Sequence, residues 1–124
     1  MTKVTASKNE ANQGGVLFTS GAATVVTLTD STWSDNSAAA GGAIHMTNAT
    51  VNVTNCTMQK NTAKLGGSIY NKLGALTTDG VTFSENAATM TATGGSGNGG
   101  AVVLVGGSYT ASAKDTFQIG RAHV

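Results

Sequence analysis

The sequence predicts an all-β protein, a parallel β-helix of about four to five rungs in which each rung is about 25 residues long. The first observation is a recurring box, an asparagine followed five residues later by a glycine pair, as in Asn36 with Gly41 and Gly42. The second is the spacing, because successive box asparagines lie 27, 25 and 25 residues apart. The third is composition: 17 glycines, 20 threonines, no proline and 10% charged residues favour short strands over helices. One repeat could not bury its own apolar face, so the stack is the folding unit.

The box occurs four times. The copies are Asn9 with Gly14-Gly15, Asn36 with Gly41-Gly42, Asn61 with Gly66-Gly67, and Asn86 with Gly99-Gly100. The last copy contains eight extra residues, so we expect an insertion loop over residues 87–98. An asparagine amide both donates and accepts hydrogen bonds, which predicts a ladder of equivalent asparagines from rung to rung. The glycine pair permits positive φ and close backbone approach at a corner.

Aligning the copies on the asparagine gives columns of apolar residues. The bulky column lies three residues before the asparagine and contains Trp33, Met58 and Phe83. Further columns contain Ser31, Cys56 and Val81; Leu28, Val53 and Thr78; Val26, Val51 and Leu76; and, after the glycine pair, Leu17, Ile44, Ile69 and Val102. Within each segment these columns are two residues apart, which is the period of a strand. We therefore expect three strands per rung, Cys56 as a small buried side chain, and Phe117 as the next member of the bulky column.

The motifs resemble those of a known family. Trp33-Ser-Asp-Asn36, Met58-Gln-Lys-Asn61 and Phe83-Ser-Glu-Asn86 are similar to the F-x-x-N motif, and Gly41-Gly-Ala-Ile44, Gly66-Gly-Ser-Ile69 and Gly99-Gly-Ala-Val102 to the G-G-A-[ILV] motif. Over residues 4–118 the chain resembles passenger domains of chlamydial polymorphic outer membrane proteins and similar bacterial autotransporters. The resemblance implies a right-handed, pectate-lyase-like β-helix. It also implies a protein exported to the bacterial cell surface or outer membrane, or secreted, and often adhesive.

The two ends of the chain interrupt the repeat. Residues 119–124 (Ile-Gly-Arg-Ala-His-Val) match the in-frame translation of a common sequencing adapter, so we expect the native domain to cover residues 1–118. The domain is then incomplete, and its partner at each end is the continuation of its own β-helix. No apolar run reaches the length of a membrane span. The formal charge of +1 gives no electrostatic argument for nucleic acid.

Two candidate binding sites follow from the pattern. Phe18, His45 and Tyr70 form a column one residue beyond the inward column, which places them on the outer face of a strand. Stacked rings there could bind a glycan or an apolar surface of a host protein, although scattered surface aromatics are the alternative. The second candidate is the insertion, with Gly97 and Asn98, whose alternative is a plain flexible loop. We find no set of metal ligands and expect no cofactor.

An enzyme is the main rival interpretation, because many β-helices cleave polysaccharides. Catalysis would need converging carboxylates, whereas the acids are scattered and Asp35 and Glu85 share a column with Lys60 between them. We therefore expect no catalysis in this segment. The expected function is an adhesive or structural display role in a bacterial passenger. The alternative is a non-catalytic part of a secreted polysaccharide lyase or glycoside hydrolase.

Overall fold

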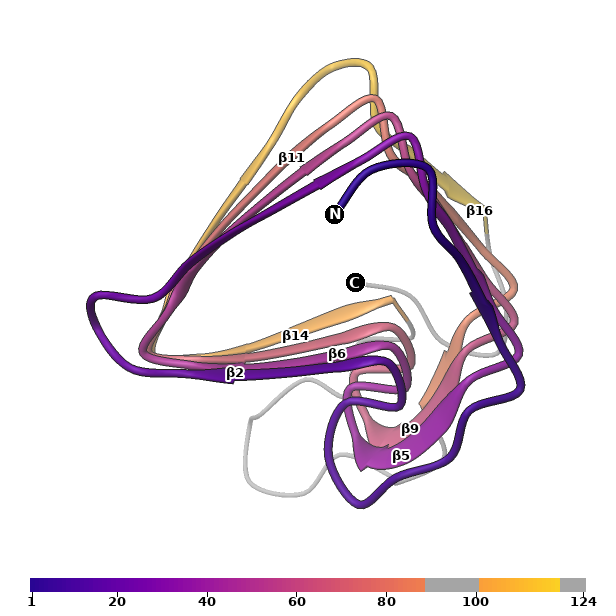
Figure 1. Cartoon of the computed structure of the whole chain (residues 1–124), viewed down its shortest axis with the longest axis horizontal. Coiled ribbons are helices and arrows are strands. Elements are labelled where there is room, and N and C mark those ends of the chain that lie inside the picture. The colour runs from indigo at the N-terminus through magenta and orange to yellow at the C-terminus, as the bar shows by residue number, and fades with distance from the viewer. Residues whose placement is uncertain (89–100, 119–124) are drawn as a thin grey trace.

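The computed structural model describes residues 1–88 and 101–118, and these residues form a parallel β-solenoid (Figure 1). They contain sixteen strands and no helix, and every strand pair between coils is parallel. Viewed down the stack in Figure 1, the chain runs clockwise from the N-terminus and away from the viewer, which is the right-handed sense that parallel crossovers favour. Successive coils lie nearly on top of one another, so equivalent residues form columns along the solenoid.

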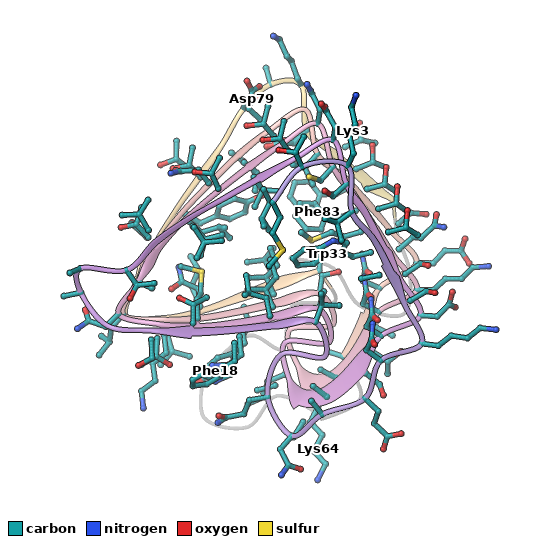
Figure 2. The ribbon with its side chains drawn as sticks, in the orientation of Figure 1. Lys3, Phe18, Trp33, Lys64, Asp79 and Phe83 are labelled. Atoms are coloured by element: carbon teal, nitrogen blue, oxygen red, sulfur yellow. The ribbon has the colours of Figure 1, made fainter. Side chains whose placement is uncertain are left out.

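The largest sheet holds the bulky core column. Its strands are β1 (Thr5–Ser7), β4 (Thr32–Ser34), β8 (Thr57–Gln59), β12 (Thr82–Ser84) and β16 (Thr116–Gln118). The register aligns Trp33 with Met58 and Met58 with Phe83, and each of these side chains is about 1% exposed. Trp33 and Phe83 point into the coil in Figure 2. Phe117 pairs with Phe83, and their rings stack at 4.9 Å between centroids, so the predicted position of Phe117 is confirmed.

In two further sheets, inward and outward residues alternate along each strand, and most of the inward residues are apolar. One contains β2 (Leu17–Ser20), β6 (Ile44–Thr47), β10 (Ile69–Lys72) and β14 (Val102–Val105). The other contains β3 (Val25–Thr29), β7 (Thr50–Thr54), β11 (Ala75–Asp79) and β15 (Ser108–Ala111). Ile44, Ile69, Val51 and Leu76 are at most 1% exposed, so the inward columns predicted from the two-residue period are confirmed.

A fourth, shorter sheet was not predicted. It contains β5 (Ser37–Ala40), β9 (Thr62–Leu65) and β13 (Ala87–Ala88), so each complete coil has four strands and the expected three is wrong. Small residues dominate these segments, and the alternation of large apolar side chains that marks a strand is missing. Three coils have all four strands, with β1, β2 and β3 before them and β16 after them. The expected insertion over residues 87–98 is wrong at its first two positions, because Ala87 and Ala88 belong to β13; its other residues lie outside the described part of the chain.

The coils turn at four kinds of corner, and a left-handed residue begins each corner that the structure describes. Among residues 1–88 and 101–118, nine non-glycine residues and six glycines have positive φ, and they fall into four columns. The columns are Lys3, Asp30, Asn55 and Gly80; Lys8, Asp35, Lys60 and Glu85; Gly14, Gly41 and Gly66; and Gly21, Asn48, Leu73 and Gly106. Three of the four columns contain residues with side chains. The column of Gly14, Gly41 and Gly66 requires glycine, because a Cβ on Gly41 would overlap the carbonyl oxygen of Ile44.

The box asparagines form a hydrogen-bonded ladder inside the solenoid. Nδ2 donates to Oδ1 of the next asparagine at 3.0 Å from Asn9 to Asn36, 3.0 Å from Asn36 to Asn61 and 3.2 Å from Asn61 to Asn86. The same Oδ1 atoms accept the backbone N–H of the preceding asparagine at 3.0–3.1 Å. Asn36 and Asn61 are fully buried. Since every side-chain amide has partners, the ladder offsets the cost of burying it.

Candidate functional site

The outer face of the sheet β14-β10-β6-β2 carries the aromatic column. The one-to-one register aligns Phe18, His45, Tyr70 and Val103, and two residues further along the strands it aligns Ser20, Thr47, Lys72 and Val105. Both columns point outward because the residues between them, including Met46 and Asn71, are buried inside the coil. In Figure 2 Phe18 lies outside the coil, on the opposite side of this sheet from Trp33 and Phe83.

Three of these rings stack. The Phe18 and His45 centroids are 5.1 Å apart with 19° between the ring planes, and His45 and Tyr70 are 4.8 Å apart with 21°. Phe18 is 51% exposed and Tyr70 is half-buried, whereas His45 is only 5% exposed. The outward direction inferred from the sequence is therefore right, but His45 is buried between its neighbours. We name Phe18, His45 and Tyr70 the aromatic column.

The His45 imidazole is held neutral. Burial lowers the pKa of His45 below its usual value of 6.5, and the nearby positive charge of Lys72 lowers it further, while the proximity of its own backbone opposes this shift. Within the described residues, Nδ1 of His45 has no hydrogen-bond partner. The column is thus an apolar stack that contains one unsatisfied polar atom.

Lys72 is the functional candidate that sequence reasoning missed. It is exposed, and it lies on the same face of β10 as Tyr70 because the two are separated by one inward residue. The four strands of this sheet contain no aspartate or glutamate. Lys72 could have been found from the sequence, because the same two-residue alternation that predicts an outward Tyr70 also predicts an outward Lys72.

The acids of the last coil have structural roles. The Asp115 carboxylate accepts hydrogen bonds from the backbone N–H of Val81 at 2.8 Å, the N–H of Ser112 at 2.8 Å and Oγ1 of Thr78 at 2.7 Å. Oη of Tyr109 lies 2.9 Å from the same Thr78 hydroxyl, and burial raises the pKa of Tyr109 to about 12. The Asp115 carboxylate and the Thr78 and Tyr109 hydroxyls therefore lie at the polar end of the inward column that contains Thr78, and they hydrogen-bond to one another.

Cys56 is a small core residue. It is 3% exposed, and its Sγ donates to the Thr54 carbonyl oxygen at 3.3 Å. Burial raises the pKa of the Cys56 thiol, which disfavours the reactive thiolate. Ser31 makes the equivalent bond one rung earlier, from Oγ to the Thr29 carbonyl at 2.9 Å.

An open hollow of about 440 Å³ lies at the corner column that contains Leu73. Its floor is made of small residues such as Gly74 and Gly107. The nearby Asn71 amide bonds to Gly74 and Ser108 and is already satisfied. The hollow therefore presents little chemistry of its own.

The remaining candidates differ in what the structure says of them. Gly97 and Asn98 lie outside the described residues. Within residues 1–88 and 101–118, no group of three or more His, Cys, Asp or Glu is placed to hold a metal ion. No helix in the same ranges could span a membrane.

Comparisons with protein-family models, with curated proteins and with solved structures find no match to this chain.

Proposed function

We propose that this chain is part of a bacterial β-helix passenger, on the cell surface or secreted, that displays a contact surface for adhesion and performs no catalysis itself. The aromatic column is the observation that carries the proposal. The resemblance of the repeat motifs to surface passengers gives the biological setting. The chain would act as a rigid rod whose outward residues meet the ligand.

The geometry of the column supports ring stacking with a partner. Phe18 is half exposed, so one part of its ring is free to cover the apolar face of a sugar or a nonpolar side chain. His45 and Tyr70 lie on β6 and β10, which are each paired on both sides, and Phe18 lies on β2, which pairs with β6. This pairing fixes the spacing of the three rings. A pre-organised surface loses less conformational entropy when it binds than a flexible loop does.

Two of the six acids, Asp79 and Asp115, have hydrogen-bonding roles in the fold that fit a non-catalytic chain. Asp115 is engaged by three donors, and Asp79 accepts from Oγ of Ser112 at 2.7 Å. A general acid or base must be able to reach a substrate, and these oxygens are committed to the fold. The alternative role, a non-catalytic part of a polysaccharide lyase or glycoside hydrolase, would use the same column to bind substrate.

The test is binding of the purified chain to immobilised glycans and to host-cell surface proteins. We expect measurable binding that falls at least fivefold in Phe18→Ala and in Tyr70→Ala. Thr27→Ala is the matched control, because Thr27 is an exposed outward residue on a different sheet. Binding that survives both aromatic substitutions, or hydrolysis of any glycan by the chain, would contradict the proposal.

A further inference from the structure

We propose that the ligand of the aromatic column is an acidic glycan, a chain of sugars that carry carboxylates, with Lys72 as the residue that selects the charge. This inference rests on the proposed function and adds the chemical class of the ligand. It is carried by the position of Lys72 beside the stacked rings and by the absence of acids from the same sheet.

The spacing brings a ring and a cation within reach of one sugar. Tyr70 and Lys72 are two residues apart on one strand face, which corresponds to about 6.6 Å along β10. A sugar that contacts the exposed parts of the Phe18 and Tyr70 rings would place its substituents near the neighbouring outward residues Ser20, Thr47, Lys72 and Val105. The ammonium group of Lys72 sits on a flexible four-carbon stem and can meet a carboxylate there.

The charge of this face is not neutralised by its own sheet. Strands β2, β6, β10 and β14 carry no carboxylate, and Lys72 has no ion pair within the described part of the chain. The residues aligned with it on the adjacent strands are Thr47 and Val105. An anionic ligand would therefore meet a cation without displacing an internal partner, which favours it over a neutral or cationic one.

The other members of the surface suit a sugar rather than an acidic peptide. The Thr47 and Ser20 hydroxyls can donate to or accept from sugar hydroxyls. Neighbouring rungs are about 4.8 Å apart, close to the length of one pyranose unit, so a glycan along the solenoid axis can contact Phe18 and Tyr70, which lie two rungs apart on either side of the buried His45.

The experiment is an NMR titration of the ¹⁵N-labelled full chain with a tetragalacturonate and with its uncharged methyl ester. We expect the acid to bind more tightly than the ester, and the preference to shrink as salt is raised. Lys72→Gln should weaken binding of the acid by up to about fivefold, the range of a solvent-exposed ion pair, and leave the ester unchanged. Lys64→Gln is the control, since Lys64 is an exposed lysine on β9 that points away from the column in Figure 2.

The outcomes separate the two proposals. Equal binding of acid and ester, unchanged in Lys72→Gln but lost in Phe18→Ala, would overturn the acidic ligand and leave the aromatic column as the binding surface. Binding of poly-glutamate as tight as that of the glycan, and unaffected by Phe18→Ala, would overturn the glycan in favour of general attraction to anions. No binding of either sugar would contradict the acidic-glycan inference, and a protein ligand sensitive to Phe18→Ala would still preserve the proposed function.

Discussion

Oδ1 of Asn61 accepts two hydrogen bonds from Asn36, one from its Nδ2 at 3.0 Å and one from its backbone N–H at 3.1 Å. The two residues are one coil apart, and both side chains are fully buried. Nδ2 of Asn61 in turn donates to the Trp33 carbonyl at 3.1 Å. One side chain thus ties together the asparagine ladder and the strand of the bulky core column.

Asn61→Ala should destabilise the fold strongly, because it leaves the buried backbone N–H of Asn36 without an acceptor and leaves Nδ2 of Asn36 with only the Ala6 carbonyl. We expect a loss of about 2–4 kcal/mol in the free energy of unfolding, measured by urea denaturation. Asn9→Ala is the control: Asn9 is exposed and only donates to Asn36, so its loss should be about 1 kcal/mol or less. Equal effects of the two substitutions would contradict the role given to the ladder.

Substitutions at two corner glycines, Gly66 and Gly80, should differ in their effect on stability, although both residues have positive φ. Gly66→Asn should disrupt the fold, because its Cβ would overlap the carbonyl oxygen of Ile69. Gly80→Asn should change the free energy of unfolding by no more than about 1 kcal/mol, since Asn55 already occupies that column with a φ of 51°. Thermal unfolding followed by circular dichroism distinguishes the two. A tolerated Gly66→Asn would show that the glycine pair is not required by backbone contact.

The buried His45 in the aromatic column predicts that the free energy of unfolding falls at acid pH. Because burial lowers the pKa of His45 in the folded chain, the unfolded chain binds the proton more readily below pH 6.5. The contribution of neutral His45 to the free energy of unfolding is therefore complete above about pH 6.5 and is lost as pH falls below that value. His45→Phe keeps a ring in the stack and should flatten the stability profile between pH 7 and pH 5. A profile unchanged by that substitution would contradict the buried, neutral state of His45.

The surroundings of Cys56 predict that replacing it by serine has a small effect on stability and that its thiol is unreactive in the folded protein. Cys56→Ser should alter the free energy of unfolding by no more than about 1.5 kcal/mol, because Ser31 makes the same side-chain bond one rung earlier. In the folded protein, the thiol should react with Ellman's reagent only after denaturant is added. Rapid reaction of the native protein would show that Cys56 is accessible.

The inward columns could be predicted from the sequence because each depends only on a two-residue alternation and a 25-residue repeat. Trp33, Met58 and Phe83 align as those two periods require. The fourth strand could not be predicted in this way, since Ala38 and Ala63 are too small to mark a buried face. Asn71 was also missed, as a buried polar residue in a column that otherwise contains Thr19, Met46 and Leu104.

The aromatic column was only partly predictable. Parity gives the direction of a side chain, which was enough to place Phe18 and His45 outside the coil. Burial of His45 depends on the rings one coil above and below it, and this requires the register of three separate strands. Sequence spacing alone does not say how closely those rings approach.

The most direct test of this account is a set of nuclear Overhauser effects between aromatic side chains of neighbouring coils. Phe18 and His45 are 27 residues apart, and His45 and Tyr70 are 25 apart, so their rings meet only if the coils stack in register. We predict cross-peaks between Phe18 and His45, between His45 and Tyr70, and inside the core between Phe83 and Phe117. Core cross-peaks without those of the outer column would contradict the proposed binding surface, and the absence of all three would contradict the solenoid itself.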